Sequence, residues 1–213
     1  MPSVADAWRR IDTEVSERSG GRSRVVAVSK SQPLESIIEV TAAGCRRIGE
    51  NYAQELAGKR PGLPDGVEIH FIGQLQTNKV RLVAGMVSLW HTVDRPSLVL
   101  EIAKRAPGAE VLLQVDLTGE PGKGGCSESE LDPLLEMAGA NGLAVRGLMT
   151  VGPTSADIDE TRRVFAATRR LAESRGLPEL SMGMSADWPI GVDEGSTLVR
   201  IGTAIFGHRP PAP

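Results

Sequence analysis

The sequence predicts an α/β fold, a single (β/α)8 TIM barrel preceded by one extra helix. Short apolar runs alternate with amphipathic stretches along the chain, and about eight strand–helix units follow the first helix. Repeated units of this kind predict a parallel sheet, and about eight of them can close it into a barrel. No linker divides the units, so we expect residues 1–207 to form one domain and residues 208–213 a disordered tail.

The individual elements follow from the spacing of apolar residues and from the turn residues between them. Val4, Trp8, Ile11 and Val15 recur at helical spacing and predict a helix over residues 4–18. Apolar runs predict strands at residues 24–29, 46–50, 67–73, 87–93, 110–117, 144–151, 178–183 and 196–202. Amphipathic stretches predict the intervening helices at residues 33–44, 51–59, 77–86, 96–106, 127–140, 156–175 and 185–194.

An open, doubly wound sheet is the alternative architecture for repeated strand–helix units. Such a sheet has fewer strands for this length and usually carries a glycine fingerprint directly after its first strand. Here the chain reads SKSQP over residues 29–33, with no glycine. The closed barrel is therefore the favoured fold.

Composition limits the partners that the chain can have. The 213 residues carry a formal net charge of −3 without a basic block, which argues against nucleic acid. No apolar run approaches the roughly 20 residues of a membrane span, and the N-terminus lacks an apolar secretion signal. The two cysteines and three histidines show no disulfide or metal-ligand spacing. We expect a cytoplasmic monomer without a metal.

Lys30 ends the first apolar run, VVAVSK, where a barrel places its active site. Active sites of such barrels lie at the carboxyl ends of the strands. Apolar walls around the side chain would lower the pKa of the amine, and a neutral amine can form a Schiff base with an aldehyde. The alternative is a lysine whose stem follows the strand end and whose ammonium group lies in solvent.

The loops after the seventh and eighth strands predict a phosphate site. Barrels often bind phosphate in these loops, on the N-terminus of a short extra helix. Gly202 lets the backbone approach an anion closely, and Thr203 offers an amide and a hydroxyl. The segment SMGMS (181–185) supplies the other loop. A plain glycine turn with a serine helix cap is the alternative.

Arg200 lies two residues before Gly202 and can point inward at the ring of whatever carries the phosphate. A buried or surface ion pair is the alternative role. A Schiff-base lysine, a phosphate site and a cation facing a ring together indicate pyridoxal 5'-phosphate (PLP). Arginine keeps its proton at neutral pH, so it would leave the pyridine nitrogen unprotonated and the ring a poor electron sink.

Several segments now carry a family resemblance. They are VVAVSK, GENYAQE, HFIGQLQTNK, GEPGKGGC, VRGLMTVG, SMGMSAD and STLVRIGTAIFG, in this order. Over about residues 5–207 they resemble the YggS/PROSC family of pyridoxal phosphate homeostasis proteins. The resemblance implies a fold-type III PLP barrel, similar to the barrel domain of alanine racemase standing alone.

The resemblance also implies which residues contact the cofactor. Lys30 would carry PLP as a Schiff base, and Arg200 would face the pyridine nitrogen. The other implied contacts are Ser185, Gly202 and Thr203 with the phosphate, Asn51 and Met149 along the pocket, and Ser181 near the phosphate. Two segments depart from the family pattern. Residues 122–126 read GKGGC where SKSGC is common, and the tail reads HRPPAP without the usual acidic–Tyr pair.

Binding, rather than turnover, is the predicted activity. A racemase needs two bases, one on each face of the substrate carbon. Alanine racemase takes one of them, a tyrosine, from a second domain, whereas this chain is expected to hold only the barrel and one tyrosine, Tyr52. The resemblance implies a carrier or buffer in intracellular PLP homeostasis, without robust catalytic activity and with apo PLP-dependent enzymes as recipients. The alternatives are a PLP-dependent amino-acid racemase or related fold-type III enzyme, and a cofactor-free Schiff-base lyase.

Overall fold

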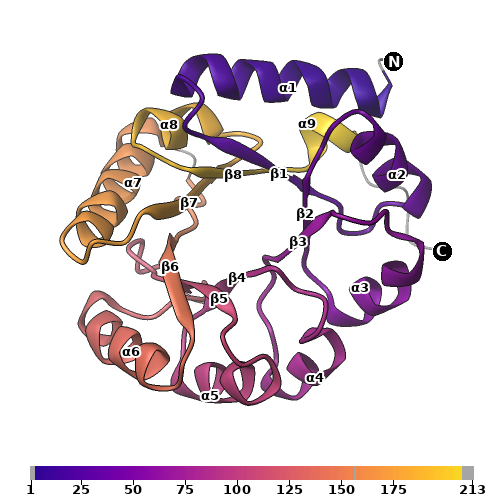
Figure 1. Ribbon diagram of the computed structural model, residues 1–213. Helices are drawn as coiled ribbons and strands as arrows, with labels where there is room; N and C mark the ends of the chain where they lie inside the picture. Colours follow the sequence, from indigo (N-terminus) through magenta and orange to yellow (C-terminus); the bar gives the residue numbers. More distant parts are fainter. Residues whose placement is uncertain (1–2, 156, 208–213) are drawn as a thin grey trace.

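The computed structural model describes residues 3–155 and 157–207 and shows a closed barrel of parallel strands (Figure 1). The strands follow one another in chain order around the barrel, and β8 pairs with β1 to close it. Their bounds are β1 (Arg24–Val28), β2 (Arg47–Glu50), β3 (Glu68–Phe71), β4 (Leu89–Val93), β5 (Glu110–Gln114), β6 (Ala144–Met149), β7 (Glu179–Met184) and β8 (Leu198–Ile201). The predicted barrel is confirmed, and the doubly wound sheet is excluded.

Helices surround the barrel on its outside (Figure 1). They are α1 (Val4–Ser19), α2 (Leu34–Ala42), α3 (Ala53–Lys59), α4 (Val80–Val83), α5 (Pro96–Arg105), α6 (Glu128–Ala140), α7 (Ile158–Glu173), α8 (Trp188–Asp193) and α9 (Thr203–Phe206). Two 3-10 turns, η1 (Arg60–Gly62) and η2 (Thr77–Lys79), precede β3 and α4. The extra N-terminal helix is confirmed, whereas the predicted tail, residues 208–213, lies outside the described residues.

Three helices are shorter than their apolar spacing predicts. The helix expected over residues 77–86 is the turn η2 followed by the four-residue α4. The helix expected from residue 185 begins at Trp188, because the Asp187 carboxylate accepts a hydrogen bond from the Met184 amide and holds the preceding residues in a turn. The helix expected from residue 51 begins at Ala53. These shorter helices leave Ser185 and Asn51 in turns at strand ends.

Helix α1 covers the seam where β8 meets β1 (Figure 1). Its buried face, which includes Trp8, Ile11 and Val15, belongs to the same apolar cluster as strand residues Val25 and Val199. Helices α8 and α9 also pack against α1. The helix therefore shields the closure of the barrel from water.

The barrel interior combines a small apolar cluster with buried polar side chains. The apolar cluster consists of Val26, Leu89, Leu112, Met149 and Leu198. His70, His91, Ser181 and Arg200 are also buried, and each contributes from a different strand. Most of the large apolar side chains instead pack between the strands and the surrounding helices. The interior is therefore unusually polar for a protein core.

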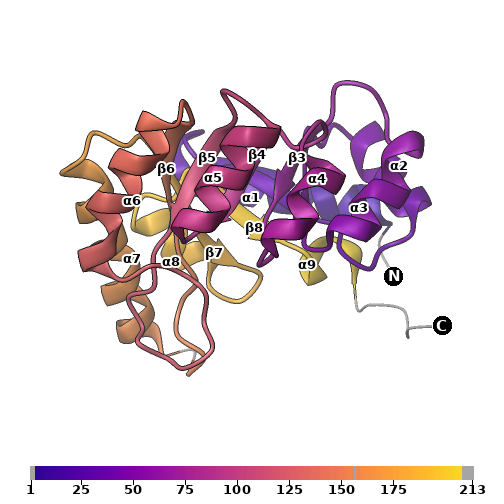
Figure 2. The same ribbon diagram turned by 90° about the horizontal axis from the view of Figure 1, so that it is seen from below.

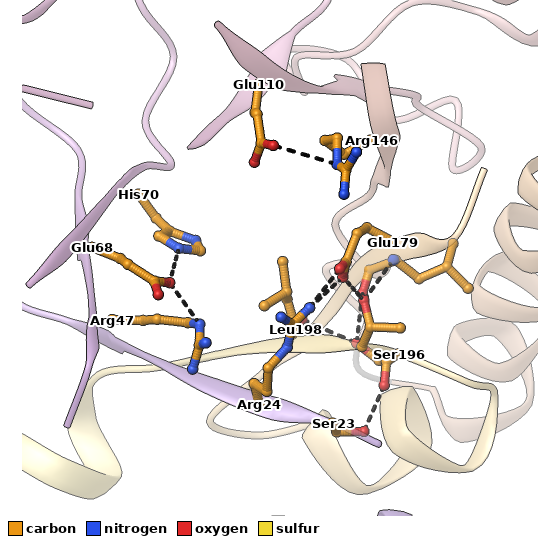
Figure 3. Close-up of polar contacts among 12 residues, drawn as sticks. Ser23, Arg24, Arg47, Glu68, His70, Glu110, Arg146, Glu179, Ser196 and Leu198 are labelled. Atoms are coloured by element: carbon orange, nitrogen blue, oxygen red, sulfur yellow. Dashed lines mark hydrogen bonds and ion pairs between the residues drawn. The ribbon is translucent and has the colours of Figure 1, made fainter. Parts of the chain in front are cut away.

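The two ends of the barrel differ. Ion pairs line the end formed by the amino ends of the strands (Figure 3). They join Arg24 to Glu179 at 2.6 Å, Arg47 to Glu68 at 2.9 Å and Arg146 to Glu110 at 3.6 Å. Seen from the side, the loops after β5 and β6 project from the opposite end, where α9 also lies (Figure 2). Lys123 joins these two loops, because its Nζ donates to the Gly152 carbonyl at 2.7 Å.

Truncating Ile11 should destabilise the fold far more than truncating Ile38, an isoleucine on α2. Ile11 is 4% exposed against the β8–β1 seam, whereas Ile38 is 44% exposed. Loss of a buried isoleucine side chain costs about 2–5 kcal/mol because a cavity remains, whereas exposed truncations stay within about 0.5 kcal/mol. Urea unfolding of Ile11→Ala and Ile38→Ala measures both. Equal losses of unfolding free energy would contradict the role assigned to α1.

Candidate functional site

A cavity of about 420 Å³ opens at the carboxyl ends of the strands. Its lining includes every predicted site residue except Ser181, namely Lys30, Asn51, Met149, Ser185, Arg200, Gly202 and Thr203. These residues come from β1, β2, β6, β7 and β8 or from the turns after them. The structure therefore brings residues from both ends of the chain into one site.

Lys30 lies in a turn two residues beyond the end of β1, rather than at the end of the strand. The next residue, Ser31, has a φ of 58°, a left-handed conformation that non-glycine residues rarely adopt. The Ser31 amide donates to Glu55 Oε1 at 2.6 Å, which holds this conformation in place. The turn that presents Lys30 to the cavity is therefore fixed from the direction of α3.

A buried ion pair supports the same turn. Lys59 Nζ donates to Glu50 Oε1 at 2.9 Å and to the Ser29 carbonyl at 2.8 Å, and it lies 2.6 Å from Glu55 Oε1. The Ser29 hydroxyl also donates to Glu50 Oε1, at 2.7 Å. Burial raises the pKa of the Glu50 carboxyl, although Lys59 and the Ser29 hydroxyl oppose this. Sequence reasoning missed this network, which joins residues flanking Lys30 to β2 and α3.

Arg200 points from β8 into the barrel and is 4% exposed. One terminal nitrogen, Nη1, donates to the Ser181 carbonyl at 2.8 Å and to the Ser181 hydroxyl at 2.5 Å. The other, Nη2, donates to the Thr150 carbonyl at 2.9 Å. Burial lowers the pKa of the guanidinium to about 10, an effect that Asp187 partly offsets. Arg200 therefore remains a cation at pH 7, held at the floor of the cavity.

The turns after β7 and β8 meet at the side of the cavity. The Gly202 amide donates to the Ser185 hydroxyl at 3.4 Å, and Thr203 begins α9 directly afterwards. The first amide groups of a helix have no acceptor within the helix, so they can donate to an anion. A Cβ at Gly202 would lie 3.4 Å from the Val28 side chain, so the glycine is not required for packing against β1. The turn thus offers hydroxyl and amide donors to a ligand.

Asn51 contributes a polar atom that the described residues leave without a partner. Its Oδ1 is buried and accepts no hydrogen bond from residues 3–155 or 157–207. A buried polar atom without a partner costs free energy, and a bound ligand or water can remove that cost. The Asn51 backbone packs directly against Gly73, and only a glycine allows this approach, because a Cβ there would lie 2.1 Å from the Asn51 carbonyl oxygen. Met149 supplies an apolar wall next to it.

Ser181 is the one predicted site residue that does not line the cavity. It is fully buried within β7. Strand β7 continues to Met184, so Ser181 lies within the strand, four residues before Ser185 in the following turn. Its hydroxyl contacts Arg200 and His91 instead. Ser181 therefore lies against the guanidinium of Arg200, and its place relative to a phosphate stays a prediction.

Sequence reasoning also missed several residues that line the cavity. They are Val28, Gln32, Ile72, Val151, Met184, Ala186 and Gly207. Most of them lie at or just beyond the carboxyl end of a strand, so the position of the strand ends was the signal that could have found them. A larger neighbouring cavity of about 630 Å³ shares Asn51 and includes Tyr52. Tyr52 is 52% exposed there and is absent from the lining of the smaller cavity.

The described residues also bear on membranes and metal ions. None of their helices combines the length and the apolar character that a bilayer crossing requires. Among residues 3–155 and 157–207, no group of three or more histidine, cysteine, aspartate or glutamate side chains is arranged to hold a metal ion.

Comparisons with known proteins agree with this geometry. A family model of the alanine racemase N-terminal domain matches residues 5–210. A pyridoxal phosphate homeostasis protein of Deinococcus radiodurans is 42% identical over 213 aligned residues, which cover 97% of this chain and 99% of that protein. The chain belongs to the pyridoxal phosphate homeostasis protein family. The resemblance drawn from the sequence motifs is thereby confirmed.

Solved structures of other proteins share the fold of this chain. PipY of Synechococcus elongatus, solved with PLP bound, has a TM-score of 0.82 and 32% identity, covering 96% of this chain and 100% of PipY. Alanine racemase of Corynebacterium glutamicum has a TM-score of 0.76 and 21% identity, and the match covers 98% of this chain but 63% of the racemase. At that identity the likeness to the racemase concerns the fold alone. This pyridoxal phosphate homeostasis family member therefore corresponds to the barrel part of the racemase.

Replacing Lys59 by methionine should make the free energy of unfolding depend more strongly on pH than it does in the wild type. The folded-state pKa of Glu50 is already raised by burial, and loss of Lys59 raises it further. A raised pKa means that the carboxyl favours the folded state below its unfolded pKa of about 4.5 and disfavours it as pH rises through the folded value. We expect Lys59→Met to lose about 3 kcal/mol at pH 8 and less at pH 5.

The double variant Glu50→Gln/Lys59→Met is the matched control, because its buried amide cannot ionise. It should regain much of the lost stability at pH 8 and lose the additional pH dependence. Urea unfolding from pH 5 to pH 8 measures all three proteins. A Lys59→Met protein whose loss is the same at every pH would contradict the assignment of Glu50 as the group that becomes unpaired.

Proposed function

We propose that this chain binds PLP in the cavity at the carboxyl ends of the strands and acts in PLP homeostasis as a carrier or buffer. Lys30 would hold the aldehyde carbon as a Schiff base. The observation that carries the proposal is the meeting of Lys30, Arg200 and the Ser185–Gly202–Thr203 turns around one cavity. The PLP-bound PipY structure and the names of the relatives support the same ligand.

The donors in the cavity match the groups of PLP. Gly202, Thr203 and Ser185 offer amide and hydroxyl donors, the chemistry that phosphate requires at neutral pH. The unpartnered Asn51 Oδ1 offers an acceptor, which suits a hydroxyl or a protonated group on the ring. When bound, PLP would supply an aldehyde for covalent attachment and a ring that can accept electrons.

Arg200 would hold the ring nitrogen as an acceptor. A guanidinium has only donor groups, so a hydrogen bond from Arg200 requires a lone pair on the nitrogen. Because the guanidinium keeps its proton at pH 7, the nitrogen would stay unprotonated. An unprotonated ring withdraws electrons weakly, which favours storage of the cofactor over strong carbanion stabilisation.

The lining of the cavity supports binding over racemisation. Lys30 and Arg200 are the ionisable residues among those that line it, within the described part of the chain. A guanidinium that stays protonated is a poor proton acceptor, so Lys30 alone is suited to move a proton. The one tyrosine of the chain, Tyr52, lines the neighbouring cavity. A racemase would need a second base on the opposite face of the substrate.

The remaining parts of the proposal concern the cell. We propose that the protein works as a monomer in the cytoplasm and transfers PLP to apo PLP-dependent enzymes. The filled barrel supports the monomer, since its interior needs no second subunit to bury it. A Schiff base supports transfer, because an incoming amine can displace Lys30 from the aldehyde reversibly.

Borohydride should fix PLP to Lys30. Reduction of the PLP-loaded protein is expected to give a pyridoxyl adduct on the peptide that contains Lys30, measured by mass spectrometry after digestion. Lys30→Ala should lose both the adduct and the visible absorbance of the bound cofactor. Lys79→Ala changes a lysine of the neighbouring cavity and should keep both. An adduct on another lysine, or none, would overturn the proposed attachment.

Transfer and proton exchange should separate a carrier from an enzyme. PLP-loaded protein freed of unbound cofactor is expected to restore the activity of an apo-aminotransferase, whereas Lys30→Ala treated in the same way should not. In deuterium oxide, the loaded protein should exchange the α-proton of alanine no faster than free PLP does, because the cavity lacks a second base. Exchange well above free PLP would instead support the racemase alternative.

A further inference from the structure

A line of hydrogen-bonded side chains crosses the barrel interior beneath the cavity. Arg200 Nη1 lies 2.5 Å from Ser181 Oγ, and Ser181 Oγ lies 3.0 Å from His91 Nδ1. His91 Nε2 lies 2.8 Å from His70 Nδ1. At the opposite opening, His70 Nε2 lies 3.8 Å from Glu68 Oε2 (Figure 3). We call this series from Arg200 to Glu68 the relay.

The two charged ends give the relay a direction. Arg200 can only donate, so the Ser181 oxygen accepts from it and the hydroxyl hydrogen is available for His91 Nδ1. When His91 Nδ1 accepts this hydrogen bond, His91 carries its hydrogen on Nε2 and donates to His70 Nδ1. His70 in turn carries its hydrogen on Nε2 and directs it toward Glu68, which can only accept when ionised. The three hydrogen bonds from Arg200 to His70 therefore point away from the guanidinium.

The surroundings of each histidine agree with this neutral arrangement. Burial lowers the pKa of His91 well below its ordinary value, and the neighbouring His70 and Arg200 add to the effect. Burial also lowers the pKa of His70, although Glu68 opposes this and Arg47 and Arg24 reinforce it. The nearby His70 side chain lowers the pKa of Glu68, which keeps the lower end anionic. Both imidazoles are thus neutral at pH 7, with one donor and one acceptor nitrogen each.

We propose that His91 and His70 are positioning residues for Arg200, acting through the hydroxyl of Ser181. Because His91 Nδ1 accepts the hydrogen bond from the Ser181 hydroxyl, the lone pairs of Ser181 Oγ stay directed at Arg200 Nη1. The guanidinium is then fixed by this oxygen and by the carbonyl groups of Ser181 and Thr150. The consequence for PLP rests on the proposed function, in which Arg200 holds the ring nitrogen.

Burial indicates that the two histidines do more than fill space inside the barrel. His91 is fully buried, so its imidazole cannot obtain its partners from bulk water, whereas His70 is 3% exposed and lines the cavity at the amino end of the barrel. A buried polar group that loses its partner costs about 1–3 kcal/mol. Apolar residues already fill neighbouring interior positions, including Leu89 on the same strand as His91. Two neighbouring histidines cost more free energy at these positions than apolar residues would, unless their hydrogen bonds are satisfied. Their hydrogen bonds lead to Ser181 and so to Arg200, which gives them a role that apolar residues could not have.

The first test uses the wild-type protein without cofactor, with variants needed only to assign its signals. Nitrogen-15 NMR of the PLP-free protein at pH 7 should show the hydrogen on Nε2 and a bare Nδ1 for both His70 and His91. Substitution of each histidine in turn assigns the signals. A hydrogen on Nδ1 of either residue, or a doubly protonated ring, would overturn the proposed direction of the relay.

The second test compares substitutions in the relay by their affinity for PLP. His91→Leu and Ser181→Ala should each raise the Kd for PLP about tenfold, since a hydrogen bond to a charged group contributes on that order. His91→Asn places an amide oxygen near the position of Nδ1 and should retain most of the affinity. Thr168→Val removes a fully buried hydroxyl on α7, outside the relay, and should leave the Kd unchanged.

The outcomes distinguish this inference from the proposed function. Wild-type affinity in both His91→Leu and Ser181→Ala would overturn the positioning role, as would equal losses in His91→Asn and His91→Leu. Should His91→Leu fail to fold, Ser181→Ala and the NMR measurement still decide. Absence of a pyridoxyl adduct on Lys30 in the wild type would overturn the proposed function, whereas the NMR result in the PLP-free protein would stand independently.

Discussion

The pairing of β8 with β1 is the interaction on which the site depends. In its register Val26 lies beside Arg200 and Ala27 beside Ile201, so the last strand delivers its arginine next to the strand that leads to Lys30. The pairing also brings the turn at Gly202 against Val28. Helix α1 shields this seam, which explains why a barrel of consecutive strand–helix units carries one helix ahead of its first strand. The pairing that closes the sheet is therefore also the pairing that brings the two halves of the site together.

Closure also buries charge, and the arrangement of the polar residues follows from that. An isolated guanidinium in the interior would lose most of its hydration. Three oxygen atoms therefore surround Arg200, two from Ser181 in β7 and one from Thr150, directly after β6. Glu50 and Lys59 form the second buried group, beneath the turn that carries Lys30. Both groups lie next to the cavity, whereas the main apolar core lies outside the barrel. The polar interior is therefore concentrated where it fixes the residues that face a ligand.

The sequence predicted those parts of the structure that depend on a single segment. Lys30, Arg200 and Gly202 could be placed because each lies at or near a strand end, and strand ends in a barrel share one face. Contacts that require two segments were missed. The joining of Glu50 to Lys59, and of His70 to His91, depends on register and helix orientation, which apolar spacing does not encode. The contacts of Ser181 with Arg200 and His91 were also missed, because they depend on which residues of β7 point into the barrel.

The contacts around Lys30 bear on how a cofactor could be both held and released. Lys59 and Glu55 bind the Ser29 carbonyl and the Ser31 amide, which are backbone groups on either side of Lys30. The position of the turn is therefore set by its backbone, while the lysine side chain enters the cavity. A site that fixes the backbone and the Arg200 guanidinium in advance gains affinity for a ligand, because less freedom is lost on binding. Neither constraint needs a second base, so affinity and turnover are separable in this barrel, and a Schiff base on Lys30, as proposed above, would stay open to exchange with another amine.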